Sequence, residues 1–217
     1  RLFRILQNFS DCCKVISKDD AVPNSDIHVP LMGLPHLMSI NDIPAPIPYL
    51  RAEEGLTKEW AECLSGNKFK VGLNWQGNRA YETDYLRSIP FNDMEPLVES
   101  GLADFVSMQK GATAEKIPNK SNFLNLGSVL DIKDGFVDTA AVMMDLDLII
   151  TSDTASAHLA GALGKPVWVL LNSAPDWRWL LEREDTPWYP TMRLFRQPSP
   201  RDWPSVMTAV QNALKDF

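Results

Sequence analysis

Residues 147–171, DLIITSDTASAHLAGALGKPVWVLL, contain two apolar runs separated by a helix of small residues. The runs DLIITS and PVWVLL are nearly continuous rather than alternating, which is typical of central strands covered on both faces of a sheet. Between them, residues 154–164 are expected to form a helix, because glycine and then proline follow the last apolar positions. This strand–helix–strand unit predicts a parallel sheet.

The same alternation extends outward from this unit over residues 70–217. Further strands are expected at 70–75, 104–109, 122–127 and 192–197, and further helices at 91–101, 139–146 and 205–217, the last capped near Asp202 or Ser205. Strands that alternate with helices predict an α/β fold with a Rossmann-like parallel sheet and helices on both faces. Ligands of such sheets bind at the carboxyl ends of the strands, so the loops that follow the strands are the candidate site.

The first fifty residues have a different character. We expect a helix within residues 1–10 and short strands at 12–17 and 26–31, which together are too small to bury a core. Prolines at 44, 46 and 48 stiffen the backbone and predict a connector, followed by a short helix at 57–66. Because the chain begins at Arg1 without an initiator methionine, we expect it to be part of a longer protein.

Composition narrows the class of protein. The formal net charge of −7 argues against a general nucleic-acid-binding surface. The sequence contains no apolar run long enough to cross a membrane and no signal peptide. The three cysteines, Cys12, Cys13 and Cys63, have neither metal-ligand spacing nor a disulfide pattern, and are expected to be reduced thiols of a cytoplasmic protein.

The start of the 154–164 helix is the strongest candidate site. Asp153 or Thr154 is expected to cap it, leaving the N–H groups of Ala155, Ser156 and Ala157 directed above the sheet. Helix amino termini favour anions, and small side chains allow a close approach, so a diphosphate fits this position. The alternative is that the cap and the small residues serve only helix stability and packing.

His158 lies one turn into the same helix, on the same face as Thr154. It is a candidate donor to a phosphate or a sugar hydroxyl. The alternative is a partly buried histidine that is hydrogen-bonded to a carbonyl.

Two other loops carry polar candidates. The loop after the strand at 70–75 contains Asn78 in a turn and the cations Arg79 and Arg87, whose guanidinium groups suit phosphate oxygens. The loop after the strand at 104–109 contains Lys110 and Glu115. Each could equally be a solvated surface residue.

The segment after residue 171 is rich in aromatic residues. Trp177, Trp179, Trp188 and Tyr189 could stack on a base or a sugar, although packing against the sheet is the preferred interpretation. Asp176 directly follows the strand end and is the better polar candidate.

Several common motifs are missing from the sequence. It has no zinc pattern, no G-x-S-x-G turn, no phosphate-binding G-x-x-x-x-G-K-[ST] loop and no G-x-G-x-x-G fingerprint. Asp145 and Asp147 have the spacing of a metal pair, but they precede a strand and are interpreted as a turn.

The chain resembles the heptosyltransferase-like glycosyltransferases of carbohydrate-active family nine. The resemblance rests on VGLNWQGN (71–78), RSIP (87–90), FVSMQKG (105–111), the stretch 147–171 and APDWRWLLEREDTPWYPTMRLFRQP (174–198). The last two stretches also resemble the glycosyltransferase part found behind tetratricopeptide repeats in many bacterial proteins.

This resemblance implies a two-domain GT-B architecture whose C-terminal half binds a nucleotide-sugar donor. The chain would then comprise a remnant of the N-terminal Rossmann-like half (1–50), a linker with a short helix (51–69) and the C-terminal nucleotide-sugar-binding domain (70–217). The implied donor and diphosphate site consists of Asn78, Arg87, Lys110, Asp153, Thr154, Ala155, Ser156 and His158, with Glu115 and Asp176 near the nucleoside.

The implied reaction is metal-independent transfer of a sugar from a nucleoside diphosphate to an acceptor hydroxyl, with inversion and without a cofactor. The acceptor could be a glycan, the lipopolysaccharide core or a protein. The general base is expected in the missing N-terminal half, so this chain alone should turn over little or nothing.

The family usually has glycine at the position of Ala155 and lysine at that of Arg87. Two rivals remain open, a nucleotide-sugar 2-epimerase of the same architecture and a non-catalytic binding or scaffold module.

Overall fold

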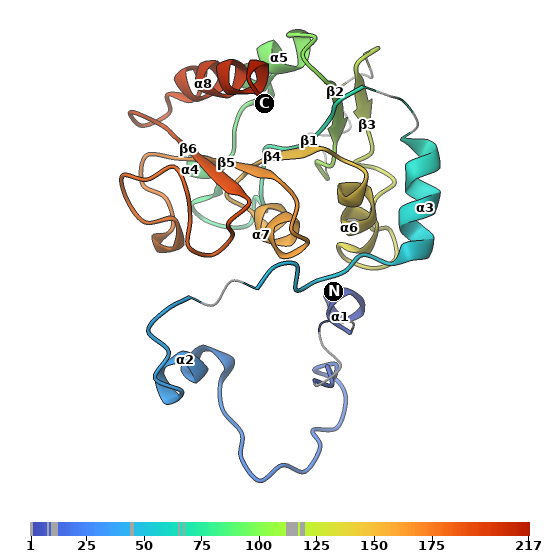
Figure 1. Cartoon of the computed structure of the whole chain (residues 1–217), viewed down its shortest axis with the longest axis vertical. Coiled ribbons are helices and arrows are strands. Elements are labelled where there is room, and N and C mark those ends of the chain that lie inside the picture. The colour runs from blue at the N-terminus through green and yellow to red at the C-terminus, as the bar shows by residue number, and fades with distance from the viewer. Residues whose placement is uncertain are drawn as a thin grey trace.

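A computed structural model describes residues 2–7, 9, 13–43, 46–64, 66, 68–111, 117 and 120–217, and it contains one sheet of six parallel strands (Figure 1). The strands are β1 (Lys70–Asn74), β2 (Asp104–Ser107), β3 (Phe123–Asn125), β4 (Leu148–Ser152), β5 (Val167–Leu171) and β6 (Met192–Arg196). Their order in the sheet is β3-β2-β1-β4-β5-β6. The predicted Rossmann-like α/β fold is therefore confirmed.

The continuous apolar runs arise because both faces of the sheet are buried. In β5, Val167, Val169 and Leu171 enter one hydrophobic core, whereas Trp168 and Leu170 enter the other. Successive strand side chains point to opposite faces, so only a strand covered on both sides needs apolar residues at every position.

Helices cover the two faces as separate layers (Figure 1). The helices are α3 (Glu54–Cys63), α5 (Phe91–Glu99), α6 (Val137–Met144), α7 (Ala155–Ala162) and α8 (Trp203–Lys215). On one face lie α5 and α8, and on the other lie α6 and α7, with α3 outside α6. Asp202 caps α8 by accepting a hydrogen bond from the Ser205 N–H at 3.1 Å, as predicted. None of the helices in the described ranges is long and apolar enough to cross a membrane.

The strand order places the chain's change of direction between β1 and β4. From β1 the chain runs outward through β2 and β3, then returns to pair β4 on the opposite side of β1, with Asn74 in register with Thr151. At such a switch point the loops after the two strands leave toward opposite faces and open a crevice at their carboxyl ends.

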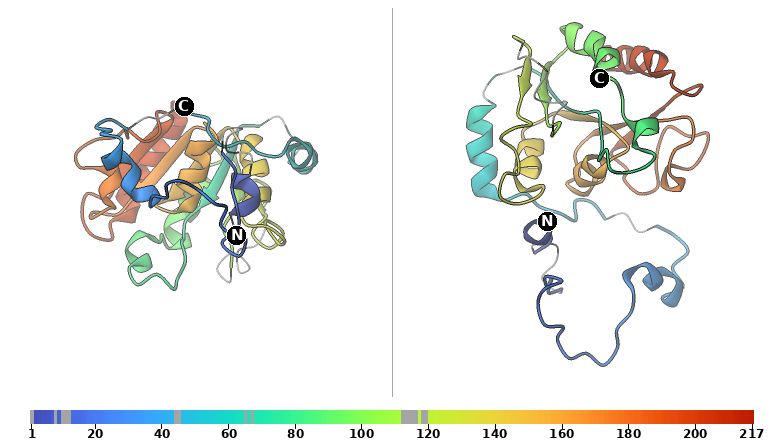
Figure 2. Two further views of the ribbon diagram at one scale, coloured as in Figure 1. Left: turned by 90° about the horizontal axis from the view of Figure 1, so that it is seen from below. Right: turned by 180° about the vertical axis from the view of Figure 1, so that it is seen from behind.

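The N-terminal segment corrects part of the sequence prediction. Its described residues contain only the single helical turns α1 (Phe3–Leu6), η1 (Leu31–Gly33) and α2 (Leu34–Leu37). The strands expected at 12–17 and 26–31 are wrong, because residues 13–17 and 26–31 form no strand. Figures 1 and 2 show this segment extending away from the sheet, where it has no neighbouring strand with which to pair.

Hydrogen bonds attach the N-terminal segment to the rest of the chain. Arg4 donates to Glu53 at 2.7 and 2.6 Å and to Asp134 at 2.8 Å. The N–H groups of Tyr49 and Leu50 both donate to the carbonyl of Ala162, at the end of α7, at 2.9 and 3.1 Å. Residues 49 and 50 are thereby held against the helix that carries the candidate site, while the proposed division of the chain at residues 50 and 69 stays a prediction.

Candidate functional site

A cavity of about 500 Å³ lies at the carboxyl end of the sheet, between the loops that follow β1, β4 and β5. The structure brings together there, from the sequence-predicted site residues, Arg87, Asp153, Thr154, Ala155, His158 and Asp176. These residues come from three separate loops, so their convergence follows from the parallel strands that deliver the loops to one edge.

The first turn of α7 forms the floor of this site. Thr154 has extended backbone angles and occupies the cap position, but neither it nor Asp153 makes a side-chain cap hydrogen bond in the described structure. The predicted side-chain cap is therefore wrong. The Thr154 hydroxyl is instead used across the switch point, where it donates to Asn74 Oδ1 at 3.3 Å. Among the described residues, the N–H groups of Ala155 and Ser156 have no acceptor.

Arg87, at the end of the short helix α4 (Asp84–Arg87), joins two loops of the site. Its Nε donates to the buried carboxylate of Asp84 at 3.0 Å, and its Nη1 donates to the backbone carbonyl of Asp153 at 2.9 Å. Gly77 leaves room for this pair, since a Cβ there would lie 2.6 Å from Arg87 Nη2. Arg87 is thus a structural bridge as well as a cation beside the cavity.

A second cation of the site, Arg178, was not singled out from the sequence. Arg178 lies on η2 (Trp177–Trp179) and lines the cavity. Its Nη1 pairs with Asp176 Oδ1 at 2.8 Å. Burial alone would raise the pKa of Asp176, but the backbone and side-chain hydrogen bonds from Arg178 bring it below its ordinary value. The sequence feature that could have identified Arg178 as a site residue is its position two residues after Asp176, in a candidate loop.

His158 is fixed by aromatic neighbours. Its ring stacks on Trp179 with a centroid distance of 5.3 Å, and its Nδ1 lies 3.2 Å from the hydroxyl of Tyr189. The histidine is partly buried, as the alternative interpretation has it, but its described hydrogen-bond partner is a phenol and not a carbonyl. Burial lowers the pKa of His158, so the imidazole is neutral near pH 7.

Asp153 is the other titratable group of the site. Burial raises the pKa of its carboxyl, and the nearby Trp179 indole, His158 and Arg87 act in the opposite direction. The Trp179 Nε1 is fully buried and lies beside this carboxylate without completing a well-formed hydrogen bond.

The other aromatic side chains of the loop after β5 divide into two groups. Trp179 and Tyr189 are buried in the core, which confirms the packing interpretation for these two residues. Trp177 is 63% exposed and lies under the guanidinium of Arg178, and its ring meets Trp188 edge-on.

Some sequence-predicted residues lie away from the cavity lining. Asn78 accepts a hydrogen bond from the Ala80 N–H at 3.0 Å, and Lys110 is paired with Asp131 at 3.5 Å. Ser156 is buried within α7 and is not one of the residues that line the cavity. Glu115 lies outside the described residues. The roles assigned to these residues stay predictions.

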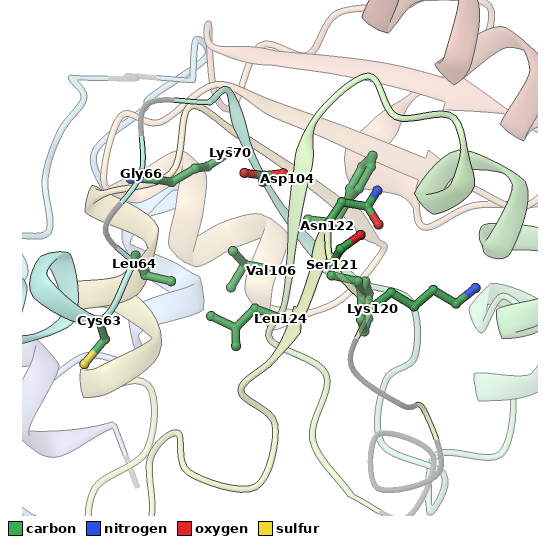
Figure 3. Close-up of a pocket in the computed structure, with 12 residues that line it drawn as sticks. Cys63, Leu64, Gly66, Lys70, Asp104, Val106, Lys120, Ser121, Asn122 and Leu124 are labelled. Carbon is green, nitrogen blue, oxygen red and sulfur yellow. The ribbon is translucent and has the colours of Figure 1, made fainter.

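A second cavity, of about 270 Å³, lies at the opposite ends of the strands (Figure 3). It contains Lys70 and Lys120, but Lys70 pairs with Asp145 at 2.7 Å, and Lys120 pairs with Glu95 and Glu99, each at 2.9 Å. The cations of both cavities are paired with carboxylates, but no helix begins among the described residues that line this one. It therefore lacks free helix amides and is the weaker candidate for an anionic ligand. Asp145 lies in the turn before β4, as predicted.

We expect the free energy of unfolding to decrease as the pH falls below 6.5, the ordinary pKa of histidine. Since burial lowers the folded-state pKa of His158, the unfolded chain binds more protons between the two pKa values, and the stabilisation present above pH 6.5 is lost. Asp153, with its raised pKa, acts in the opposite direction at lower pH. Urea unfolding at pH 7.5 and about 5.5 should therefore show a smaller loss in His158→Gln than in the wild type.

The exposed residue His36 provides the control for this experiment. His36→Gln should keep the wild-type pH dependence, and an unchanged pH dependence in His158→Gln would contradict the assignment.

Known proteins are similar to this chain in sequence or in fold. The chain is 32% identical over 175 residues to Protein FlbA of Caulobacter vibrioides, a match that covers 78% of this chain and 29% of that protein. Among solved structures, E. coli ADP-heptose lps heptosyltransferase II is similar with a TM-score of 0.51 and 16% identity, covering 79% of this chain and 55% of that one.

A glycosyl transferase of family 9 from Veillonella parvula DSM 2008 has a TM-score of 0.49 and 14% identity, covering 77% of this chain and 54% of that structure. No protein-family model matches the chain. The chain thus spans about half the length of the heptosyltransferase and less than a third of FlbA. Its fold is glycosyltransferase-like.

Proposed function

We propose that this chain is the donor-binding half of a GT-B glycosyltransferase and that the cavity at α7 binds the diphosphate of a nucleoside-diphosphate sugar. The observation that carries the proposal is the position of the free Ala155 and Ser156 amides, at the β1/β4 switch point, beside the cations Arg87 and Arg178. A helix amino terminus with unpaired amides attracts negative charge.

The size of the cavity supports a ligand of this class. Its volume of about 500 Å³ lies within the range of about 300–1,000 Å³ that is usual for small-molecule sites. The exposed ring of Trp177 and the half-buried His158 offer surfaces for a base or a sugar at its margin.

The carboxylates of the site oppose an anion, and their charges must be balanced. Asp176 is paired with Arg178 at 2.8 Å, and the pKa of Asp153 is raised by burial. Arg87 retains N–H groups beyond those used on Asp84 and on the Asp153 carbonyl, because a guanidinium has five. Asp84 and Asp176 balance the charges of Arg87 and Arg178, so an anion would be held by the unused N–H groups of Arg87 and the free amides of α7 and not by an excess of cations.

The proposed reaction is metal-independent transfer of the sugar to an acceptor hydroxyl, with inversion at the sugar carbon. The amides of α7, Arg87 and Arg178 would stabilise the departing diphosphate as its charge develops. A base in an N-terminal half would accept the proton of the acceptor, so this chain alone would bind donor without turnover. The acceptor, a glycan, the lipopolysaccharide core or a protein, and an association with tetratricopeptide repeats belong to the same proposal.

Isothermal calorimetry tests this function directly. ADP, UDP, GDP and their sugars are titrated into the chain, with adenosine and uridine as ligands that lack phosphate, in Mg²⁺ and in EDTA. We expect saturable binding of at least one diphosphate, no binding of the nucleosides and no effect of EDTA.

A folded chain that binds none of these diphosphates would contradict the proposal and favour the scaffold alternative. Conversion of a single nucleotide-sugar into its epimer would favour the epimerase.

A further inference from the structure

A chain of hydrogen-bonding groups leads from the N-terminal segment to the cavity. The Tyr49 hydroxyl lies 3.1 Å from the Tyr189 hydroxyl, which in turn lies 3.2 Å from His158 Nδ1. The three residues belong to the end of the N-terminal segment, to the loop before β6 and to α7, so segments far apart in the sequence contribute to one array. His158 is the member of the array that reaches the cavity.

Close packing fixes the Tyr189 ring on α7. A Cβ on Gly161 would lie 2.5 Å from Tyr189 Cδ1 and 2.6 Å from its Cγ, so only glycine lets the ring lie this near the helix. Gly161 follows His158 by three residues and is therefore on the same side of α7. Tyr189 is 7% exposed, which limits the positions that its hydroxyl can adopt.

The backbone fixes Tyr49 on the same helix. The N–H groups of Tyr49 and Leu50 donate to the Ala162 carbonyl at 2.9 and 3.1 Å, and Pro48 packs against Gly164, with a Cβ there lying 3.5 Å from Pro48 Cβ. The backbone of Tyr49 and the ring of Tyr189 are therefore both in contact with α7, the helix that carries His158.

The chemistry of the three groups sets the direction of the array. A phenol O–H is a better donor than an imidazole N–H, and the bare nitrogen of a neutral imidazole is a better acceptor than a phenol oxygen. Burial raises the pKa of Tyr189, so its hydroxyl keeps its proton. Tyr189 then donates to His158 Nδ1 and accepts from Tyr49.

We infer that Tyr189, held in turn by Tyr49, is a positioning residue that fixes His158 as its Nε2–H tautomer, so that the histidine offers a hydrogen-bond donor to an acceptor oxygen of the bound ligand. A ring nitrogen's partner determines which nitrogen carries the proton. The inference rests on the proposed function for the ligand, whereas the tautomer itself belongs to the ligand-free chain.

Nitrogen-15 NMR of the imidazole groups at pH 8 tests the tautomer without a ligand. The chain has three histidines, so His158→Gln assigns the signals of His158. We expect a protonated Nε2 and a bare Nδ1 in the wild type, and a mixture of tautomers in Tyr189→Phe. A wild-type His158 protonated at Nδ1, or a Tyr189→Phe spectrum identical to that of the wild type, would overturn the inference.

ADP titration of the same variants tests the consequence for binding. Loss of one oriented hydrogen bond is expected to weaken ADP binding about fivefold in Tyr189→Phe, with a smaller loss in Tyr49→Phe. Phenylalanine keeps the ring against Gly161, and near-ultraviolet circular dichroism checks the fold. Tyr85→Phe, at a 64% exposed tyrosine outside the cavity lining, is the matched control and should bind as the wild type does.

The two hypotheses fail in distinguishable ways. If the wild type has the Nε2–H tautomer but binds no nucleoside diphosphate, the proposed function fails while the positioning of His158 stands. If the wild type binds ADP and Tyr189→Phe changes the tautomer without weakening that binding, the role of the tautomer in ligand binding is refuted and the proposed function is not.

Discussion

Ala155→Asp is expected to raise the dissociation constant for ADP by at least about tenfold. Ala155 is exposed in the first turn of α7, beside the free amides, so the new carboxylate would stand where the diphosphate is proposed to bind. Two like charges about 4 Å apart near a protein surface repel by about 4 kcal/mol, and solvent screening reduces this to a loss of tenfold or more. Calorimetric titration at low and high salt measures the effect, which should shrink as salt is added.

This substitution separates binding from folding. An aspartate in the first turn of a helix is stabilising, by about 0.3–1 kcal/mol, because it interacts favourably with the helix dipole. The melting temperature of Ala155→Asp should therefore be equal to or above that of the wild type. Ala155→Asn has nearly the same shape without the charge and should lose much less affinity. Equal affinities of the aspartate variant and the wild type would exclude the amides of α7 as the anion site.

Arg87→Ala is expected to lower the free energy of unfolding by about 2–3 kcal/mol, because it leaves a buried carboxylate without its cation. Asp84 is 3% exposed, and after the substitution it would retain only the hydroxyl of Ser88, which donates to its Oδ2 at 2.8 Å. This loss in the free energy of unfolding is smaller than that expected for breaking a fully buried ion pair, because the Arg87 side chain is 24% exposed. The melting temperature should fall by about 5–10 °C.

A double-mutant cycle tests the cause of this destabilisation. Asp84→Asn removes the buried charge, so the double variant Arg87→Ala/Asp84→Asn should be more stable than Arg87→Ala alone. Arg79→Ala, at an exposed arginine of the same loop, should melt within about 1 °C of the wild type. If Arg87→Ala matched the Arg79 control, the pair with Asp84 would contribute nothing to stability.

The dual position of Arg87 changes how its role in binding can be studied. From the sequence, Arg87 is a loop cation whose guanidinium suits phosphate oxygens. In the structure, the same side chain holds Asp84 and the Asp153 carbonyl, so a reversed charge would disturb the loops as well. Ala155, which has no side-chain hydrogen bond to lose, is the cleaner position for testing the anion site.

The fold was predictable because its signals are local. Strands β4 and β5 are apolar at nearly every position, and glycine or a capping aspartate ends or begins several of the helices. The strands predicted at residues 12–17 and 26–31 are wrong because apolar content alone does not make a strand. A strand forms only beside a partner strand, and no partner strand lies beside residues 13–17 and 26–31 in the described structure.

By itself the sequence determined the parallel sheet, its helices and the loops in which a ligand site could lie. Apolar patterns and the glycine, proline and capping residues at the ends of elements depend on neighbours only a few residues apart. The tertiary structure alone decided that the Thr154 hydroxyl donates to Asn74, that Arg178 joins the site and that Tyr49 is linked to His158 through Tyr189. These contacts join residues up to 140 positions apart, so they depend on the strand order and on the packing of loops against α7.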